Sequence, residues 1–174
     1  MLFRSNTDLD AADRMAPKQA DIRFTMGELY GKADVLGSSV TQYDLWITSH
    51  PDDSKMMSAL YRRCSLRALQ GQDLDKGLSD CNSALRLSSK SDPAAASILR
   101  VRGLVRLRLG DYDKSIADFD DSLKLAPKNA QALYGRGVAE LRKHKTPEGQ
   151  ADLAEASKLR PNIAAEFSRR GISP

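Results

Sequence analysis

Apolar residues along this chain recur in stripes that predict amphipathic α-helices. The two clearest stripes each hold four apolar residues at intervals of 4, 3 and 4, and the second begins 38 residues after the first. They are Leu74, Leu78, Cys81 and Leu85, and then Tyr112, Ile116, Phe119 and Leu123. This spacing places each set on one face of a helix, which can bury only that face against a neighbour. The pattern therefore predicts an all-α protein built from stacked helices.

The recurrence extends beyond the apolar stripes. Asp80 returns as Asp118 at the 38-residue offset, and Gly103 returns as Gly137 at an offset of 34 residues. A helix-turn-helix unit of about 34 residues, with a small residue in its first helix, an aromatic residue in its second and a closing proline, resembles the tetratricopeptide repeat. The resemblance implies an α-solenoid, in which successive units cover one another's apolar faces.

The repeat register divides the chain into an N-terminal arm and one domain. We expect a flexible arm over residues 1–17 and a repeat domain over residues 18–174. The predicted units are a degenerate repeat at 20–53, three clearer repeats at 58–91, 96–129 and 130–163, and a C-terminal capping helix at about 162–170. Atypical units at the two ends are expected of a solenoid.

A second resemblance concerns the segment from about residue 40 to the C-terminus. Its stretches RGLVRLRLGDYDKSIADFDDSLKLAPKNAQALYGRGVAELRK and IAAEFSRRG are similar to repeat arrays of α-proteobacterial proteins. Some of those arrays are joined to a retropepsin-like protease domain. The Asp-Thr-Gly or Asp-Ser-Gly signature of that protease is absent from this sequence, so the resemblance carries over no hydrolase activity.

Positive charge is concentrated in the repeats. The chain has a net charge of +4, and residues 58–163 hold 19 basic against 13 acidic residues. In tetratricopeptide folds the first helix of each unit lines a concave groove, so the resemblance implies a basic groove. Arg100, Leu104 and Arg108 lie at intervals of four and share a helical face. The predicted partner-contacting residues are Arg62, Arg100, Leu104, Arg108, Tyr134 and Arg142.

Two other arginines suit a structural role better. Arg102 and Arg136 each precede the small glycine of a first helix, and each recurs together with an aspartate of the second helix, Asp118 or Asp152. We expect an ion pair within each unit, which would leave these two arginines unavailable to a ligand.

The sequence favours a protein-binding scaffold that takes an acidic or carboxylate-bearing segment in the groove, because the planar guanidinium suits carboxylates. Nucleic-acid binding through the same arginines is the alternative, but Tyr134 alone supplies an aromatic ring on that face, and a platform for single strands needs more. An accessory domain of an attached enzyme, or a merely solvated charged face, also remains open. No oligomeric state is predicted.

Cys64 and Cys81 are the two cysteines of the chain, and they lie on the inward stripes of one unit. They are equidistant from the turn at Gln72 and Asp73, so an antiparallel hairpin would bring them level and within reach of a disulfide. Two reduced thiols in the core are the alternative, which a cytoplasmic location would favour.

No catalytic, metal or cofactor site is predicted. His50 and His144 have no nucleophile or ligand set in their surroundings, and the phosphate-binding glycine loops are missing. The sequence also lacks an apolar run long enough to span a membrane. We expect a cytoplasmic location from the chain as given, or a periplasmic one if a signal peptide has been removed.

Overall fold

The computed structural model describes residues 6–89 and 93–174. These residues form helices and turns without any strand. In chain order the helices are α1 (Asn6–Met15), α2 (Ile22–Lys32), α3 (Leu36–Ser49), α4 (Met56–Gln70), α5 (Leu74–Leu87), α6 (Pro93–Leu109), α7 (Tyr112–Leu125), α8 (Ala130–Arg142), α9 (Thr146–Leu159) and α10 (Ile163–Ser168). The all-α prediction is confirmed.

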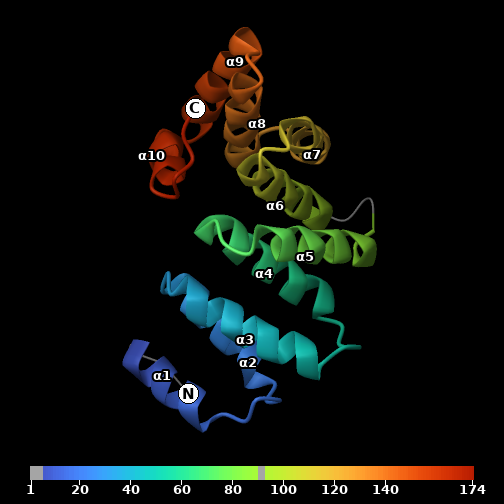
Figure 1. The fold of residues 1–174 in the computed structure, drawn as a ribbon, viewed down its shortest axis with the longest axis vertical. Coiled ribbons are helices and arrows are strands. Elements are labelled where there is room, and N and C mark those ends of the chain that lie inside the picture. Colours follow the sequence, from blue (N-terminus) through green and yellow to red (C-terminus); the bar gives the residue numbers. More distant parts are fainter. Residues whose placement is uncertain (1–5, 90–92) are drawn as a thin grey trace.

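The helices pair into four hairpins that stack in chain order (Figure 1): α2 with α3, α4 with α5, α6 with α7, and α8 with α9. The second helix of each hairpin packs on the first helix of the next, as α5 does on α6. The first helices α4, α6 and α8 also contact one another in sequence. The stack is an α-solenoid whose first helices share one face.

Glycine shapes both the turns and the interfaces of the hairpins. Gly71 and Gly110 follow α4 and α6 with φ angles of 70° and 78°, a left-handed conformation that glycine adopts without strain. Inside the stack, a Cβ atom at Gly103 would lie 3.0 Å from the buried ring of Phe119. The small residue of this first helix therefore makes room for an aromatic ring.

The last helix lies over the open end of the stack, in the region where we expected a capping helix. Helix α10 packs on α8 and α9, and its two apolar residues, Ile163 and Phe167, are buried. The apolar face that a further repeat would cover is shielded by this short helix instead.

The N-terminal residues differ from the flexible arm that we expected over residues 1–17. Residues 6–15 form α1, which packs on α2, and Leu9 is buried beside Met26 and Tyr30. The low apolar content of the segment was misleading, because Leu9, with Ala12 and Ala16 packed beside it, anchors the helix to the first hairpin. Residues 1–5 of the predicted arm, and residues 90–91 of the predicted second unit, lie outside the described residues.

Polar contacts strengthen the attachment of α1. The Tyr30 hydroxyl donates to Asp10 over 2.7 Å, and Arg23 contacts Asp13 of α1 as well as Gln42 of α3. Arg23 thus joins the second helix of its own unit to the element that precedes it. In the later units, too, an arginine links the second helix of its own unit to the element before that unit. Helix α1 therefore lies where the second helix of a preceding unit would lie.

Candidate functional site

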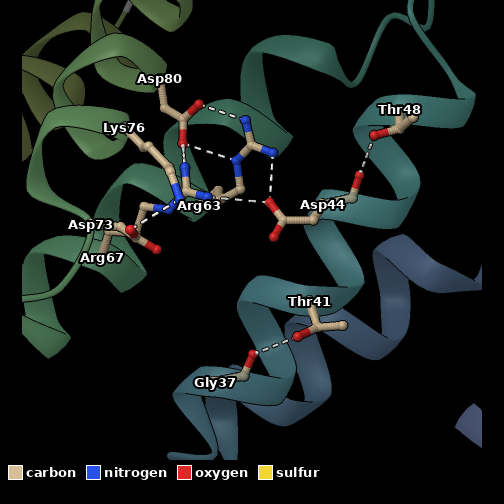
Figure 2. Close-up of polar contacts among 9 residues, drawn as sticks. All are labelled: Gly37, Thr41, Asp44, Thr48, Arg63, Arg67, Asp73, Lys76 and Asp80. Atoms are coloured by element: carbon tan, nitrogen blue, oxygen red, sulfur yellow. Dashed lines mark hydrogen bonds and ion pairs between the residues drawn. The ribbon is translucent and has the colours of Figure 1, made fainter.

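One group of arginines links the hairpins to each other and is not available for ligands. Figure 2 shows Arg63 of α4 between two carboxylates: its Nη2 lies 2.6 Å from Asp80 of α5, and its Nη1 lies 2.7 Å from Asp44 of α3. Arg67, one helical turn further, also contacts Asp80, at 2.6 Å. These charge-assisted hydrogen bonds join three helices of two successive units.

The same ladder continues in the next units and confirms the predicted internal ion pairs. Arg102 binds Asp118 in its own unit and reaches back to Asn82 in the preceding one, at 2.9 Å. Arg136 similarly binds Asp152 and, over 2.6 Å, Asp120. The hydrogen bond to Asp152 raises the pKa of Arg136. Each of these arginines clamps two units together.

The arginines of the shared face have a different environment. Arg100, Leu104 and Arg108 of α6 line a cleft of ≈ 550 Å³, a volume within the usual range of ligand sites. The opposite wall is formed by α10 and the residues after it, including Phe167. The cleft therefore lies between the first helices and the C-terminal end of the chain.

Arg100 and Arg108 have no carboxylate partner among the described residues. Burial lowers the pKa of Arg100, outweighing a favourable contact with the hydroxyl of Tyr61, and burial also lowers the pKa of Arg108, assisted by the charge of Arg170. The Nε atom of Arg108 is buried without a hydrogen-bond acceptor. Arginine stays protonated in proteins, so both positive charges remain, and both are short of an anion.

This lack of a partner sets the two residues apart. In the described part of the chain, every other buried or half-buried arginine contacts a carboxylate, and these arginines are Arg23, Arg63, Arg67, Arg102, Arg106, Arg136 and Arg170. A partly desolvated positive charge is costly unless it is paired. The uncompensated charge in the cleft is therefore suited to an anionic ligand.

The other predicted contact residues are not gathered in this cleft. Arg62 lies nearer the N-terminus, where its Nη2 is 2.7 Å from Glu28 of α2. Tyr134 is 4% exposed because Phe167 of α10 packs on it, with ring centroids 4.6 Å apart. Arg142, on α8, donates to the main-chain carbonyl of Ser173 over 3.0 Å. The structure brings together Arg100, Leu104 and Arg108, and it places the C-terminal residues over Tyr134 and Arg142.

Several residues of the cleft were not predicted. Asp34, Glu166, Arg169, Arg170 and Ile172 all line it. They lie in a turn of the first unit and at the C-terminus, outside the helical faces that the repeat pattern identifies. Gly171 was the sole sequence signal, because a glycine just after a helix marks a change of chain direction.

The two cysteines form a disulfide in the structure, between the first and second helices of the α4–α5 hairpin. Both residues are fully buried. The bond lies inside the stack, away from the cleft lining, and closes one hairpin.

The described residues offer no site for a metal ion. Within residues 6–89 and 93–174, no group of three or more His, Cys, Asp or Glu side chains could hold one. Over the same residues, no helix combines the length and the apolar character needed to cross a membrane.

Sequence comparisons identify what the repeats are similar to. A sequence model of the tetratricopeptide repeat matches residues 65–130 and 100–163. The photosystem I assembly protein Ycf3 of Acaryochloris marina is 35% identical over 124 residues, which cover 70% of this chain and 73% of Ycf3. Protein FlbA of Caulobacter vibrioides is 26% identical over 132 residues, which cover 76% of this chain but 21% of FlbA.

Solved structures show the same fold at low sequence identity. A crystal structure of MamA has a TM-score of 0.70 and 18% identity, covering 93% of this chain and 94% of MamA. A thermophilic repeat protein of Thermus thermophilus has a TM-score of 0.67 and 14% identity, covering 89% of this chain and 84% of that one. At such identities the likeness concerns the fold alone.

Proposed function

This chain belongs to the tetratricopeptide repeat family, and we propose that it is a non-catalytic scaffold that binds an acidic or carboxylate-bearing segment of a partner protein in the cleft at Arg100, Leu104 and Arg108. The observation that carries the proposal is the missing counter-charge of Arg100 and Arg108, in a structure whose other buried arginines, among the residues described, are paired. A partner carboxylate would supply two-point hydrogen bonds to either guanidinium.

The family and its relatives support a protein as the partner. Ycf3, at 35% identity, is a photosystem I assembly protein, and an assembly role consists of bringing other proteins together. The cleft also contains apolar surface at Leu104 and Phe167, so a segment with both an acidic and an apolar residue would match it. Such grooves bind peptides through apolar anchors combined with a few charged contacts.

The structure gives less support to nucleic acid as the ligand. Tyr134 was the aromatic residue expected on the groove face, and it is covered by Phe167. Single strands bind to platforms on which successive bases stack on exposed rings. With Tyr134 covered, the lining of the cleft, as far as the chain is described, holds Phe167 as its aromatic residue, and that ring is 9% exposed.

A peptide array tests the proposed function. Peptides of random sequence with two fixed glutamates would be compared with the same peptides carrying two glutamines. We expect the wild-type chain to bind the glutamate set preferentially, and the double variant Arg100→Glu and Arg108→Glu to lose this preference. Arg86→Glu is the matched control, because Arg86 is exposed on α5, away from the cleft.

Retained folding of the double variant would be checked by circular dichroism. An equal response of wild type to glutamate and glutamine peptides contradicts the proposal, as does a loss of preference in Arg86→Glu equal to that in the double variant. A steep loss of binding between low and moderate salt concentrations is expected for any ligand held by exposed charges, so the array is read at one fixed ionic strength.

A further inference from the structure

The residues after α10 turn back into the face that α6 and α8 share. Gly171, with a φ angle of 72°, donates to Ser168, and Ile172 donates to Phe167 over 3.1 Å. This left-handed turn ends the helix and redirects the chain, and glycine suits it because it has no Cβ atom. We refer to residues 169–174 as the tail.

The first helices hold the tail by its main chain. Arg108 of α6 donates to the carbonyl oxygen of Arg170, and Arg142 of α8 donates to that of Ser173 over 3.0 Å. Between these two points Ile172 is 7% exposed and belongs to the apolar core cluster that contains Leu107 and Val138, at the edge of a small cavity; we call its place the Ile172 socket. The tail is therefore seated as a short, irregular segment with one aliphatic anchor.

A contact with the first hairpin fixes the tail further. The guanidinium of Arg170 lies 2.7 Å from Asp34, 136 residues away in the turn between α2 and α3. Figure 1 shows α10 on the side of the stack where the α2–α3 and α4–α5 turns lie. The tail thus spans from the last unit towards the first along this side.

Ordinary helix capping explains only part of this arrangement. A left-handed cap commonly brings the residue after the glycine against the last turn of its own helix, which accounts for a contact between Ile172 and Phe167. It does not account for hydrogen bonds from two other helices to the tail's carbonyl groups, or for the ion pair with Asp34. These contacts attach the tail to the face that α6 and α8 share and to the first hairpin.

The tail is nevertheless a poor electrostatic match for the cleft. It brings Arg169 and Arg170 into a site that already contains Arg100 and Arg108, and the two carboxylates that line this site are paired elsewhere, Asp34 with Arg170 and Glu166 with Arg160. The charge of Arg170 adds to burial in lowering the pKa of Arg108, which is the signature of repulsion between the two guanidinium groups. Like charges at this range oppose binding, so a segment that turns acidic residues towards Arg100 and Arg108, and keeps a basic residue beside Asp34, would be held more tightly.

We propose that the partner segment binds in place of the tail, as an extended segment without helical structure. Its one aliphatic residue occupies the Ile172 socket, and Arg108 and Arg142 hold its main-chain carbonyls. Its acidic residues face Arg100 and Arg108. The proposal rests on the proposed function and specifies its ligand. Arg100 and Arg108 are two helical turns apart, about 12 Å. An extended chain covers about 3.3 Å per residue, so the acidic residue facing Arg100 lies on the order of four residues before the residue whose carbonyl Arg108 holds.

The test uses the full chain and peptides derived from the tail. The acidic probe is Glu-Ser-Ser-Glu-Arg-Gly-Ile-Ser-Pro, laid out on residues 166–174, with one glutamate four places before the residue held by Arg108, a second in place of Arg169, and the arginine beside Asp34 kept. Ile172→Asp should release the tail, and we expect this variant to bind the probe at least tenfold more tightly than wild type does. Pro174→Asp is the matched control, since it places the same charge at an exposed position of the same tail. A probe with serine in place of isoleucine should lose at least tenfold in affinity.

Each outcome separates this inference from the proposed function. If wild type and a folded Ile172→Asp variant bind the probe equally, the partner segment does not bind in place of the tail, and the inference is overturned. The inference is also overturned if neither protein binds the probe. The peptide array would still support or contradict the acidic groove independently. If Ile172→Asp does not fold, hydrogen exchange of the wild-type chain decides: saturating probe should accelerate exchange at the Ile172 amide, and unchanged exchange overturns the inference.

Discussion

Arg102 of α6 and Asp118 of α7 form a two-point ion pair, with Nε to Oδ2 at 2.9 Å and Nη2 to Oδ1 at 2.6 Å. Arg106 adds a third contact, with its Nη1 2.8 Å from Oδ2 of the same carboxylate. Asp118 is 2% exposed, so its charge is stabilised almost entirely by these two arginines. The relationship makes Asp118 a structural residue of the stack.

We therefore expect Asp118→Ala to lower the free energy of unfolding by about 3 kcal/mol, because it leaves two partly buried guanidinium groups without their carboxylate. Urea unfolding followed by circular dichroism measures this. Asp121→Ala is the control, since Asp121 is exposed and pairs with the exposed Lys124, and it should change stability by less than about 0.5 kcal/mol. Similar losses in the two variants would contradict a structural role for Asp118.

The packing of α1 yields a second prediction. Leu9 is 4% exposed, whereas Met15 in the same helix is 84% exposed. Leu9→Ala should cost about 2 to 4 kcal/mol of stability by leaving a cavity beside Tyr30, and Met15→Ala should be nearly neutral. Urea unfolding of both variants is the measurement. If Leu9→Ala unfolds at the same urea concentration as wild type, the segment is an unpacked arm, as the sequence had suggested.

The disulfide yields a third prediction. The bond between Cys64 and Cys81 closes a loop with a sequence separation of 17 residues, for which the chain-entropy model gives about 3 kcal/mol. The oxidised protein should resist urea more than the same protein unfolded in a reductant. The variant with both cysteines changed to alanine should be indifferent to the reductant. Two free thiols per unfolded chain, measured without reductant on protein purified from its native compartment, would show that the bond does not form there.

His50 supports a prediction about pH. The pKa of His50 is raised above its ordinary value of 6.5. The main cause is a hydrogen bond to the carbonyl of Trp46, and the carboxylate of Asp21, 2.7 Å from Nε2, raises it further. Because the folded-state pKa is raised, protonation of His50 favours the folded state at low pH, and this contribution is lost as pH rises through that pKa. Asp21→Asn should lower the pKa but leave it above 6.5, since the bond to Trp46 remains.

The titration can be followed by the NMR signals of the imidazole, assigned with His50→Gln. It can also be followed by fluorescence, because Trp46 is the single tryptophan of the chain and its ring stacks on His50 with centroids 4.8 Å apart. Asp75→Asn, on the distant helix α5, serves as the control and should leave the titration unchanged. A midpoint at or below 6.5 in the wild-type protein would contradict the prediction.

The repeat architecture was predictable from the amino-acid sequence alone. Helical stripes such as Leu74 to Leu85 depend on a period that each segment carries within itself, so they can be detected before any tertiary contact is known. The pairs Arg102–Asp118 and Arg136–Asp152 were also predictable, because they recur at matching places in successive units and lie within one hairpin. The face shared by Arg100, Leu104 and Arg108 followed from helical spacing alone.

The contacts made on that face depend on how distant units are placed in space. The contact between Arg170 and Asp34 joins residues 136 positions apart, and its existence depends on the curvature that four hairpins accumulate. No local pattern encodes that sum of small rotations. For the same reason the sequence placed Tyr134 in the open groove, whereas the folded chain covers it with Phe167. It also left residues 6–15 as an arm, although Leu9 and the contacts of Tyr30 and Arg23 hold them against the first hairpin.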